Sequence, residues 1–280
     1  YSVAQLEAVA AAAERVGRRA RVHLKVDTGL SRGGAPLADW PALVDAAARA
    51  EADGTVRVAG LWSHFACSDE PEHPANAAQE AAFKEAVAHA EVVGRLDPEV
   101  LHLANSAAAL LRPGSRFDLV RFGIAAYGLS PAPAVVSAGQ LGIVPAMTVR
   151  ARVALVKDIG SGDGVSYGHT YVADGPQHVA LVPLGYGDGI PRHASSAAEV
   201  LVGGTRGRIL GRVCMDQFVV AAPSRTAAGD EVVLFGPGSS GEPTAQDWAD
   251  ACGTISYEIV TRMGGLAARA GRRHVDEETA

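Results

Sequence analysis

Residues 117–128 read FDLVRFGIAAYG, and this stretch decides the fold. We expect a short apolar strand that ends at Arg121, because α/β barrels keep their chemistry at the carboxyl ends of their strands. Gly123 and Ile124 then begin the next helix, and a glycine there lets backbone N–H groups approach a phosphate. The stretch therefore predicts a ligand with a phosphate group and an acceptor atom. The alternative is a solvated arginine after a strand and a glycine that only makes a turn.

Strands and helices alternate in the residues that precede this stretch. The expected strands span residues 22–26, 56–63, 100–104 and 119–122, and the expected helices include residues 40–52 and 75–93. Such alternation gives parallel strands with right-handed crossovers. We predict an α/β fold in which residues 1–140 form the C-terminal half of a TIM-type β/α barrel. A complete barrel has eight strands over about 250 residues, so four strands are expected upstream of Tyr1.

The N-terminal segment has the spacing of a helix. Its apolar stripe consists of Val3, Leu6, Val9, Ala13 and Val16. A stripe of this kind is predicted to cover a sheet.

The pattern changes to short β-like segments after about residue 140. Met147, Val149, Ala151, Val153 and Leu155 alternate with the residues between them, which is the period of a half-buried strand. Further strands are expected at residues 179–184, 207–213, 218–221 and 231–235. We predict that residues 141–280 form a separate all-β domain, in which residues 236–241 are an exposed loop without chemistry.

Composition restricts the possible partners. The formal charge is −6 with 25 Lys plus Arg, which argues against nucleic acid and favours a small-molecule partner. The three cysteines are widely spaced, so no disulfide framework or metal site is expected and a reducing cytoplasm fits. No apolar run or leader pattern indicates a membrane or export. The acids and histidine of residues 67–73 are expected to form a solvated loop.

Seven further motifs accompany the opening stretch in a fixed order. They are residues 23–34 (HLKVDTGLSRGG), 62–65 (WSHF), 102–108 (HLANSAA), 165–168 (VSYG), 185–189 (GYGDG), 211–217 (GRVCMDQ) and 253–258 (GTISYE). With them the chain resembles an alanine racemase of the fold-type III class, which uses pyridoxal 5'-phosphate. The resemblance runs from about residue 22 to about residue 262.

The resemblance implies that Arg121 faces the pyridine nitrogen of the cofactor. An arginine cannot give up its proton, so it leaves that nitrogen neutral and makes the ring a weaker electron sink, which suits racemisation better than transamination. His64 is implied to hydrogen-bond Arg121 and hold it in place. A core histidine satisfied by backbone groups is the alternative for His64.

The phosphate of the cofactor is implied to bind after the last two strands. Ser106, supported by Asn105, would form this site with the amides of Gly123 and Ile124. Tyr257 resembles an additional phosphate contact, and a tyrosine on the face of a β-strand is its alternative.

Tyr167 resembles the family's catalytic base. A free phenol has a pKa of about 10 and needs a nearby cation, for which Arg32 is the candidate. Arg32 and Met215 also resemble residues that bind the substrate carboxylate. Taken alone, Met215 is more typical of core packing.

Three supporting residues follow from the same resemblance. Lys25 occupies a place where many family members carry a carbamylated lysine, and a plain lysine paired with Asp27 is the alternative. Tyr186 and Asp216 resemble residues that line the way to the substrate site.

The family also binds its cofactor through a lysine in a motif close to KADAYGHG. The chain has only Lys25, Lys84 and Lys157, none of them in that context. This Schiff-base lysine is therefore expected upstream of Tyr1, and the 280 residues alone are expected to be inactive.

The implied function is the interconversion of L- and D-alanine, which supplies D-alanine for peptidoglycan. The resemblance also implies a homodimer in which the β domain of one subunit completes the site of the other. Two alternatives stay open at this point. One is an amino-acid racemase of broader specificity, and the other is a non-catalytic fragment or binding protein.

Overall fold

The computed structural model of the protein describes residues 1–264, which fold into two compact units. The first unit consists of residues 1–126 and 130–143. The second consists of residues 127–129 and, among the described residues, 144–264.

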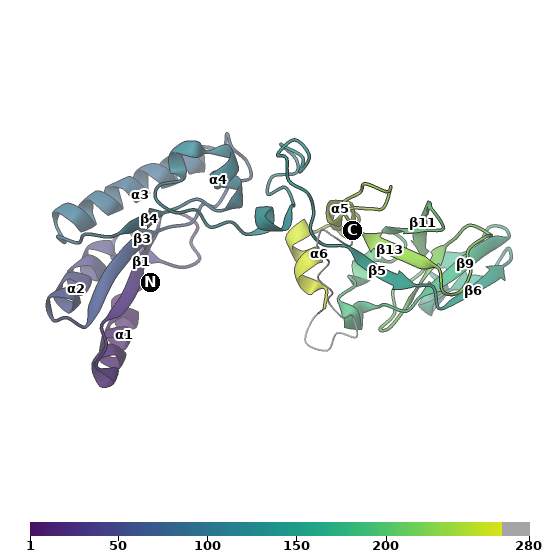
Figure 1. The fold of residues 1–280 in the computed structure, drawn as a ribbon, viewed down its shortest axis with the longest axis horizontal. Coiled ribbons are helices and arrows are strands. Elements are labelled where there is room, and N and C mark those ends of the chain that lie inside the picture. The colour runs from purple at the N-terminus through teal and green to yellow at the C-terminus, as the bar shows by residue number, and fades with distance from the viewer. Residues whose placement is uncertain (265–280) are drawn as a thin grey trace, which may run out of the picture. The chain divides into compact units, whose positions relative to one another are not determined.

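The first unit contains a parallel sheet with the strand order β2-β1-β3-β4 (Figure 1). The strands are β1 (Ala20–Asp27), β2 (Ala35–Pro36), β3 (Val56–Trp62) and β4 (Val100–His102). All three pairings are parallel, so the predicted alternation of strand and helix is confirmed. The two-residue strand β2 was not expected from the sequence.

The strand expected at residues 119–122 is wrong. Two backbone hydrogen bonds tie this stretch to β4 and the residues just after it, from Asp118 N to Leu101 O (3.1 Å) and from Arg121 N to Ala104 O (3.0 Å). The Asp118 carboxylate accepts a hydrogen bond from Leu101 N at 2.8 Å. A side chain thus takes the place of a backbone carbonyl, and no regular ladder forms.

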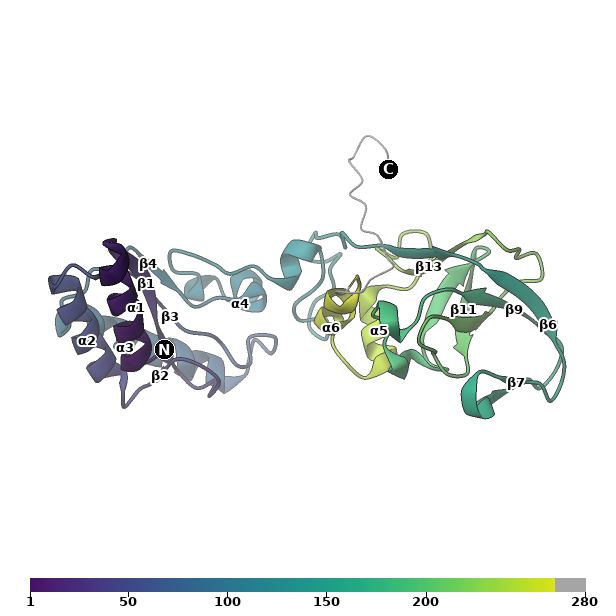
Figure 2. The ribbon, with the colours of Figure 1, turned by 90° about the horizontal axis from the view of Figure 1, so that it is seen from below.

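Helices α1 (Val3–Val16), α2 (Trp40–Ala52) and α3 (Pro74–Val92) pack on one face of this sheet (Figures 1 and 2). The buried core between them includes Leu24, Val26, Val58, Leu61, Leu43 and Phe83. The helices expected at residues 40–52 and 75–93 are confirmed. A short helix, α4 (Ser106–Leu111), follows β4.

Helix α1 forms as predicted. The Ser2 hydroxyl accepts a hydrogen bond from Gln5 N at its start, and Gly17 ends it in the left-handed conformation with φ 62°. Leu6 and Ala13 are buried, but Val16 is 67% exposed. The predicted stripe therefore covers the sheet only as far as Ala13.

The second unit is built on a seven-stranded antiparallel sheet with the order β5-β13-β10-β11-β12-β9-β6. Its strands are β5 (Val149–Arg152), β6 (Leu155–Ile159), β9 (Gln177–Val182), β10 (Glu199–Val202), β11 (Thr205–Leu210), β12 (Phe218–Ala221) and β13 (Glu231–Phe235). A separate hairpin pairs β7 (Gly164–Val165) with β8 (Tyr171–Val172). The sequence missed β10, which lies in the middle of the sheet.

One continuous segment closes this sheet on itself. Strands β5 and β6 follow each other in the chain but pair with opposite edges, β13 and β9. Between them, Val153 N donates to Asp230 O (2.9 Å) and Ala154 N donates to Leu181 O (2.9 Å). The sheet must curl for both bonds to form. The predicted alternation changes phase at this crossing, which leaves Leu155 49% exposed.

The second unit also carries helices α5 (Ala245–Cys252) and α6 (Ser256–Arg262), which the sequence did not predict. A capping box of Thr244 and Asp247 begins α5. Its buried Trp248 donates to Glu199 O and Leu234 O, which ties the helix to the sheet. Single 3₁₀ turns complete the elements, at Pro113–Ser115, Ile124–Tyr127, Tyr167–His169, Tyr186–Asp188 and Arg192–Ala194.

Candidate active site

The guanidinium of Arg121 is held from several sides. Nη1 lies 2.7 Å from His102 Nδ1 and Nη2 lies 3.1 Å from His64 Nδ1. Nη2 also donates to the carbonyl oxygens of Ser63 (2.8 Å) and Leu103 (3.1 Å). Among residues 1–264 no carboxylate pairs with this guanidinium. The solvated-arginine alternative is therefore wrong, and the hydrogen bond expected between His64 and Arg121 is present.

Burial sets the charge state of this cluster. It lowers the pKa of Arg121 to about 10. Burial, and then the charge of Arg121, lower the pKa values of His64 and His102 to about 4. Both histidines are therefore neutral at pH 7. A guanidinium can only donate, so both rings accept through Nδ1.

Lys25 lies between aromatic rings in the same unit. It is only 4% exposed, and its Nζ lies 4.6 Å from the ring centroid of Trp62 and 5.1 Å from that of Tyr1. Burial, and then the charge of Arg32, lower the pKa of Lys25. Arg121 stacks on the same Trp62 ring at 4.8 Å. Several cations thus share one region, which suits an anionic ligand.

The alternative pairing of Lys25 with Asp27 is not found among the described residues. Instead, Asp27 Oδ1 accepts hydrogen bonds from the backbone N–H groups of Gly29, Leu30 and Ser31 at 2.9, 3.0 and 3.1 Å. Burial raises the pKa of Asp27, but these three hydrogen bonds and the charge of Lys25 together outweigh burial, so the pKa is lowered. Asp27 therefore shapes the loop that leads to Arg32.

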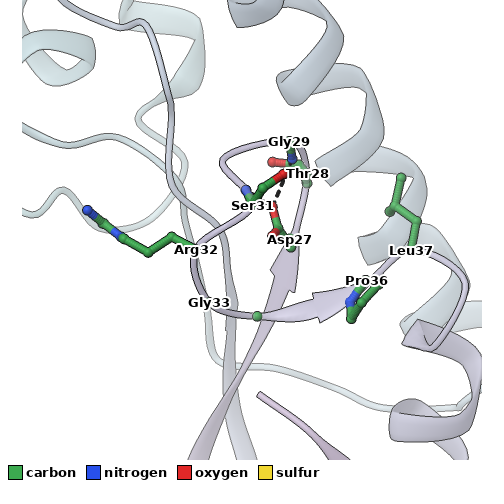
Figure 3. Close-up of a pocket in the computed structure, with 9 residues that line it drawn as sticks. Asp27, Thr28, Gly29, Ser31, Arg32, Gly33, Pro36 and Leu37 are labelled. Atoms are coloured by element: carbon green, nitrogen blue, oxygen red, sulfur yellow. Dashed lines mark hydrogen bonds between the residues drawn. The ribbon is translucent and has the colours of Figure 1, made fainter.

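Arg32 lies at the edge of an open cavity of about 540 Å³. Figure 3 shows its side chain extending away from the turn that Asp27 and Ser31 form. The lining residues are Asp27, Thr28, Gly29, Ser31, Arg32, Gly33, Gly34, Pro36 and Leu37. The arginine is exposed, so an anion in this cavity can reach it.

Ser106 is fixed by the start of helix α4. The side chain of Asn105 caps the helix by accepting from Ala108 N at 3.1 Å. The Ser106 hydroxyl accepts from Gly123 N (2.8 Å) and Ala125 N (3.4 Å). A hydroxyl that accepts twice still has its own proton to donate. This proton is available to a phosphate oxygen.

Ile124 is brought to the same place as Ser106 and Gly123. The helix expected to begin there is a single 3₁₀ turn, Ile124–Tyr127. A Cβ added to Gly123 would lie 3.8 Å from Ser106 Oγ, which is an ordinary contact, so neither close packing nor a positive φ requires glycine at this position.

Gln79 joins two loops of the site. It is buried on α3, and its Nε2 donates to His64 O (3.0 Å) and to Thr28 Oγ1 (3.3 Å). Its Oε1 accepts from Ala66 N (2.8 Å). The Thr28 hydroxyl lies 2.8 Å from that of Ser63. The loop after β1 and the loop that carries His64 are thus tied together.

Tyr167 lies in a strained turn of the second unit. Its neighbours Ser166, Gly168 and His169 all have positive φ, at 62°, 73° and 43°. The Ser166 hydroxyl donates to Arg212 O at 2.7 Å and holds the turn. Tyr167 itself is 71% exposed. Strained backbone of this kind is frequent at functional sites.

Two other loops meet this turn. Ser166 Oγ lies 3.3 Å from Cys214 Sγ. Tyr186 N donates to Cys214 O (3.0 Å), and Gly187 N donates to Met215 O (2.9 Å). Met215 is 57% exposed, so its core-packing alternative is wrong.

Asp216 belongs to the same group, because its Oδ1 lies within 3.9 Å of where a Cβ on Gly187 would stand. We call Tyr167, Tyr186, Met215 and Asp216 the tyrosine cluster. The structure therefore brings together the four residues of the second unit that the sequence placed near the substrate.

Tyr257 lies on helix α6 and is 39% exposed. The alternative that it stands on a β-strand is therefore wrong. Its role as a phosphate contact stays a prediction.

The sequence missed His102 and His23. His102 is the first residue of the motif at residues 102–108, but the sequence predicted functions only for Asn105 and Ser106 of that motif. His23 precedes Lys25 by two residues, so the two side chains leave the same face of β1. That period of two was the signal that could have identified His23.

The acidic loop at residues 67–73 is structural. Asn76 donates to Cys67 O (3.0 Å) and Glu70 O (2.9 Å), and His73 Nδ1 accepts from Ala75 N to cap α3. Within the described part of the chain, no group of three or more His, Cys, Asp or Glu residues is placed to hold a metal ion. None of the helices among residues 1–264 has the length and apolar character needed to cross a bilayer.

Comparisons with known proteins decide the family. Residues 1–131 match the profile described as "Alanine racemase, N-terminal domain", and residues 146–271 match "Alanine racemase, C-terminal domain". The chain belongs to the alanine racemase family. The resemblance and the fold class inferred from the sequence, a barrel domain followed by a β-sheet domain, are both confirmed.

Individual members of the alanine racemase family are similar to this chain in sequence and in structure. The alanine racemase of Salinispora tropica is 56% identical over 264 residues, which cover 94% of this chain and 70% of the relative. The solved alanine racemase of Streptomyces coelicolor A3(2) aligns with a TM-score of 0.92 at 56% identity, over 95% of this chain and 70% of that one. The alanine racemase of Bartonella henselae, solved with covalently bound pyridoxal phosphate, aligns with a TM-score of 0.81 at 27% identity, over 96% and 71%.

Proposed function

We propose that the protein racemises alanine with pyridoxal 5'-phosphate as its cofactor. The observation that carries this proposal is the setting of Arg121, a partly buried guanidinium that two neutral histidines hold and that pairs with no carboxylate among residues 1–264. Membership of the family supports the same reaction. Residues 1–140 would hold the cofactor, and residues 141–280 would supply the tyrosine.

The donors of the first unit fit this cofactor. The Ser106 hydroxyl and the Ile124 amide would bind the phosphate, and the Gly123 amide would join them by turning from Ser106 Oγ to a phosphate oxygen. Tyr257 of the second unit would be an additional contact. Arg121 uses only Nη1 and Nη2 for its hydrogen bonds within the described residues, so its Nε hydrogen remains to face a ring nitrogen. When bound, the cofactor supplies an electron-accepting ring that stabilises negative charge at the substrate's α-carbon.

The protein's own residues would orient the substrate and move its proton. Arg32 and the backbone of Met215 would bind the carboxylate of alanine. Burial and the charge of Arg32 lower the pKa of Lys25, so an unmodified Lys25 and Arg32 repel each other; carbamylation would convert Lys25 from a cation into an anion that pairs with Arg32 and supports it. Tyr186 and Asp216 would line the way in.

Tyr167 would exchange the α-proton of L-alanine, and the cofactor lysine would exchange that of D-alanine on the opposite face. Tyr167 is 71% exposed, and a base works best where water is excluded. We infer that a second copy of the chain covers the tyrosine cluster, so that the active enzyme is a homodimer with shared sites. The enzyme would work in the cytoplasm, and its product, D-alanine, would be used to build peptidoglycan.

The test is turnover by the full-length protein loaded with pyridoxal phosphate. Chiral chromatography should show conversion of L-alanine to D-alanine, with serine, lysine and arginine converted at least about tenfold more slowly. Faster turnover of another amino acid would contradict the assignment of alanine.

The 280 residues alone are expected to give no racemisation. Borohydride reduction of this chain with the cofactor should leave Lys25, Lys84 and Lys157 without a stoichiometric adduct. An adduct on one of them together with turnover would show that the cofactor lysine lies within these residues.

A further inference from the structure

His102 has a second partner on the side away from Arg121. Its Nε2 lies 2.8 Å from Nδ1 of His23, and the ring centroids are 5.1 Å apart. His23 is on β1 and His102 is at the end of β4, and β3 lies between these strands in the sheet. The two imidazoles therefore bridge across β3.

The sheet is adapted to this bridge at Gly60. A Cβ on Gly60 would come within 2.7 Å of His23 Cε1 and Nδ1 and within 2.9 Å of Val100 O. The register between β1 and β3 shifts at the same place, from Val22 opposite Val58 to His23 opposite Gly60. Without this bulge, residue 59 rather than the glycine would face His23. A bulge that re-aims a side chain is a recurring feature beside active sites.

The direction of each hydrogen bond in the bridge follows from Arg121. A guanidinium only donates, so His102 Nδ1 accepts and the proton of the neutral His102 ring is on Nε2. His102 Nε2–H then donates to His23 Nδ1, which must be unprotonated. The other His102 tautomer would place two donors against each other at Arg121.

We propose that His23 is a positioning residue for Arg121, acting through His102. It accepts the hydrogen bond that holds His102 in the tautomer whose Nδ1 can receive the guanidinium. The tautomers of a neutral imidazole differ little in energy, and Arg121 and His23 favour the same one from opposite sides of the ring, so loss of the His23 acceptor weakens the preference for it. The effect of His23 on catalysis rests on the proposed racemase function, whereas its effect on the His102 tautomer does not.

The direct test is nitrogen-15 NMR of histidine-labelled full-length protein. The unmodified protein should show His102 protonated at Nε2. His23→Phe removes the acceptor, so His102 should show mixed tautomers and faster exchange of its Nε2 proton. Asparagine places an amide oxygen near the position of Nδ1, so His23→Asn should restore the single tautomer.

Gly60→Ala gives an independent variant that keeps the His23 imidazole but displaces it. It should reproduce the NMR result of His23→Phe. His178→Phe, in the second unit, is the matched control and should leave His102 unchanged. With alanine, His23→Phe should lower kcat by about tenfold and change KM by less than about twofold, since Arg32 is untouched.

A wild-type His102 protonated at Nδ1 would overturn the inference. So would an unchanged His102 spectrum in His23→Phe. If His102 behaves as expected but no version of the protein racemises alanine, the proposed function fails and the inference about His23 stands.

Discussion

The surroundings of Arg121 and of Tyr167 differ in almost every physical respect. Arg121 is enclosed, with two histidine nitrogens and two carbonyl oxygens around its guanidinium. Tyr167 is 71% exposed on a turn of three residues with positive φ. The arginine region is organised by its own unit alone, whereas the tyrosine cluster presents its side chains outward. Under the proposed function, this difference means that the cofactor region is formed within one unit, whereas proton transfer by Tyr167 would need a surface that covers it.

The largest expected effect tests whether that cover is a second subunit. Tyr167→Phe removes the ionisable oxygen, so racemisation by the full-length enzyme should fall by about a thousandfold. A circular-dichroism melt should show the fold unchanged, because the phenol is exposed.

Mixing Tyr167→Phe with Arg121→Glu sharpens the comparison. If sites are shared, a mixed dimer has one site with both residues intact and one with neither. Random exchange gives about half mixed dimers, so activity should recover to about a quarter of normal. No recovery, with mixed dimers confirmed by mass, would mean that each tyrosine serves its own subunit.

Arg121→Glu alone should have the next largest effect. A carboxylate at this place would keep the pyridine nitrogen protonated and strengthen the electron sink. Racemisation should slow by about a hundredfold, and transamination should rise, which pyruvate release would measure. Arg121→Lys is the control, because it keeps the charge but cannot span both histidines. Normal racemisation by the glutamate variant would mean that Arg121 does not face the ring.

The two units should also respond to pH in opposite directions. The pKa values of His64 and His102 are lowered to about 4, so only the unfolded chain takes up their protons between about pH 6.5 and 4. The free energy of unfolding of the first unit should therefore fall as pH falls through this window. With allowance for solvent screening, each histidine accounts for a loss on the order of 1–2 kcal/mol in this free energy of unfolding.

In the second unit, the hydrogen bond that His178 donates to the Asp158 carboxylate raises the pKa of His178, so this stabilisation is lost as pH rises past that raised value. Urea unfolding should separate the units, with Trp40 and Trp62 reporting the first and Trp248 the second. His102→Gln should reduce the pH dependence of the first unit, and His178→Gln that of the second. If the first unit loses as much free energy of unfolding at low pH in His102→Gln as in the unmodified protein, the pH dependence comes from carboxylates instead.

The sequence predicted the regular helices and strands of both units because the spacing of apolar residues that marks each one lies within a short stretch of chain. The helices at residues 40–52 and 75–93 and the strands at residues 218–221 and 231–235 needed no knowledge of distant residues. The strand predicted at residues 119–122 does not form, because the Asp118 carboxylate takes the place of one backbone carbonyl and the two remaining backbone hydrogen bonds make no regular ladder.

In the candidate site, motif order identified Arg121 and His64 but not His23. Its place depends on a bulge and on a glycine in another strand, and both are properties of pairing rather than of local pattern. Gln79 was missed for a similar reason, because its partners lie in two loops that are distant from it in the sequence.

The smallest expected effect concerns the turn that carries Tyr167. Gly168 has φ 73°, and a Cβ there would lie 3.2 Å from the Arg212 guanidinium. Gly168→Ala should destabilise the turn by about 1 kcal/mol, because alanine is strained at positive φ and Arg212 must give way. Gly175, also in the second unit, has no atom within 4 Å of its added Cβ and no positive φ, so Gly175→Ala is the matched control. If the turn must hold Tyr167 in place, Gly168→Ala should lower kcat by about threefold to tenfold while the global melting temperature shifts by no more than a few degrees. Unchanged kcat with a lowered melting temperature would show that the strain serves the fold of the second unit and not the placement of the tyrosine.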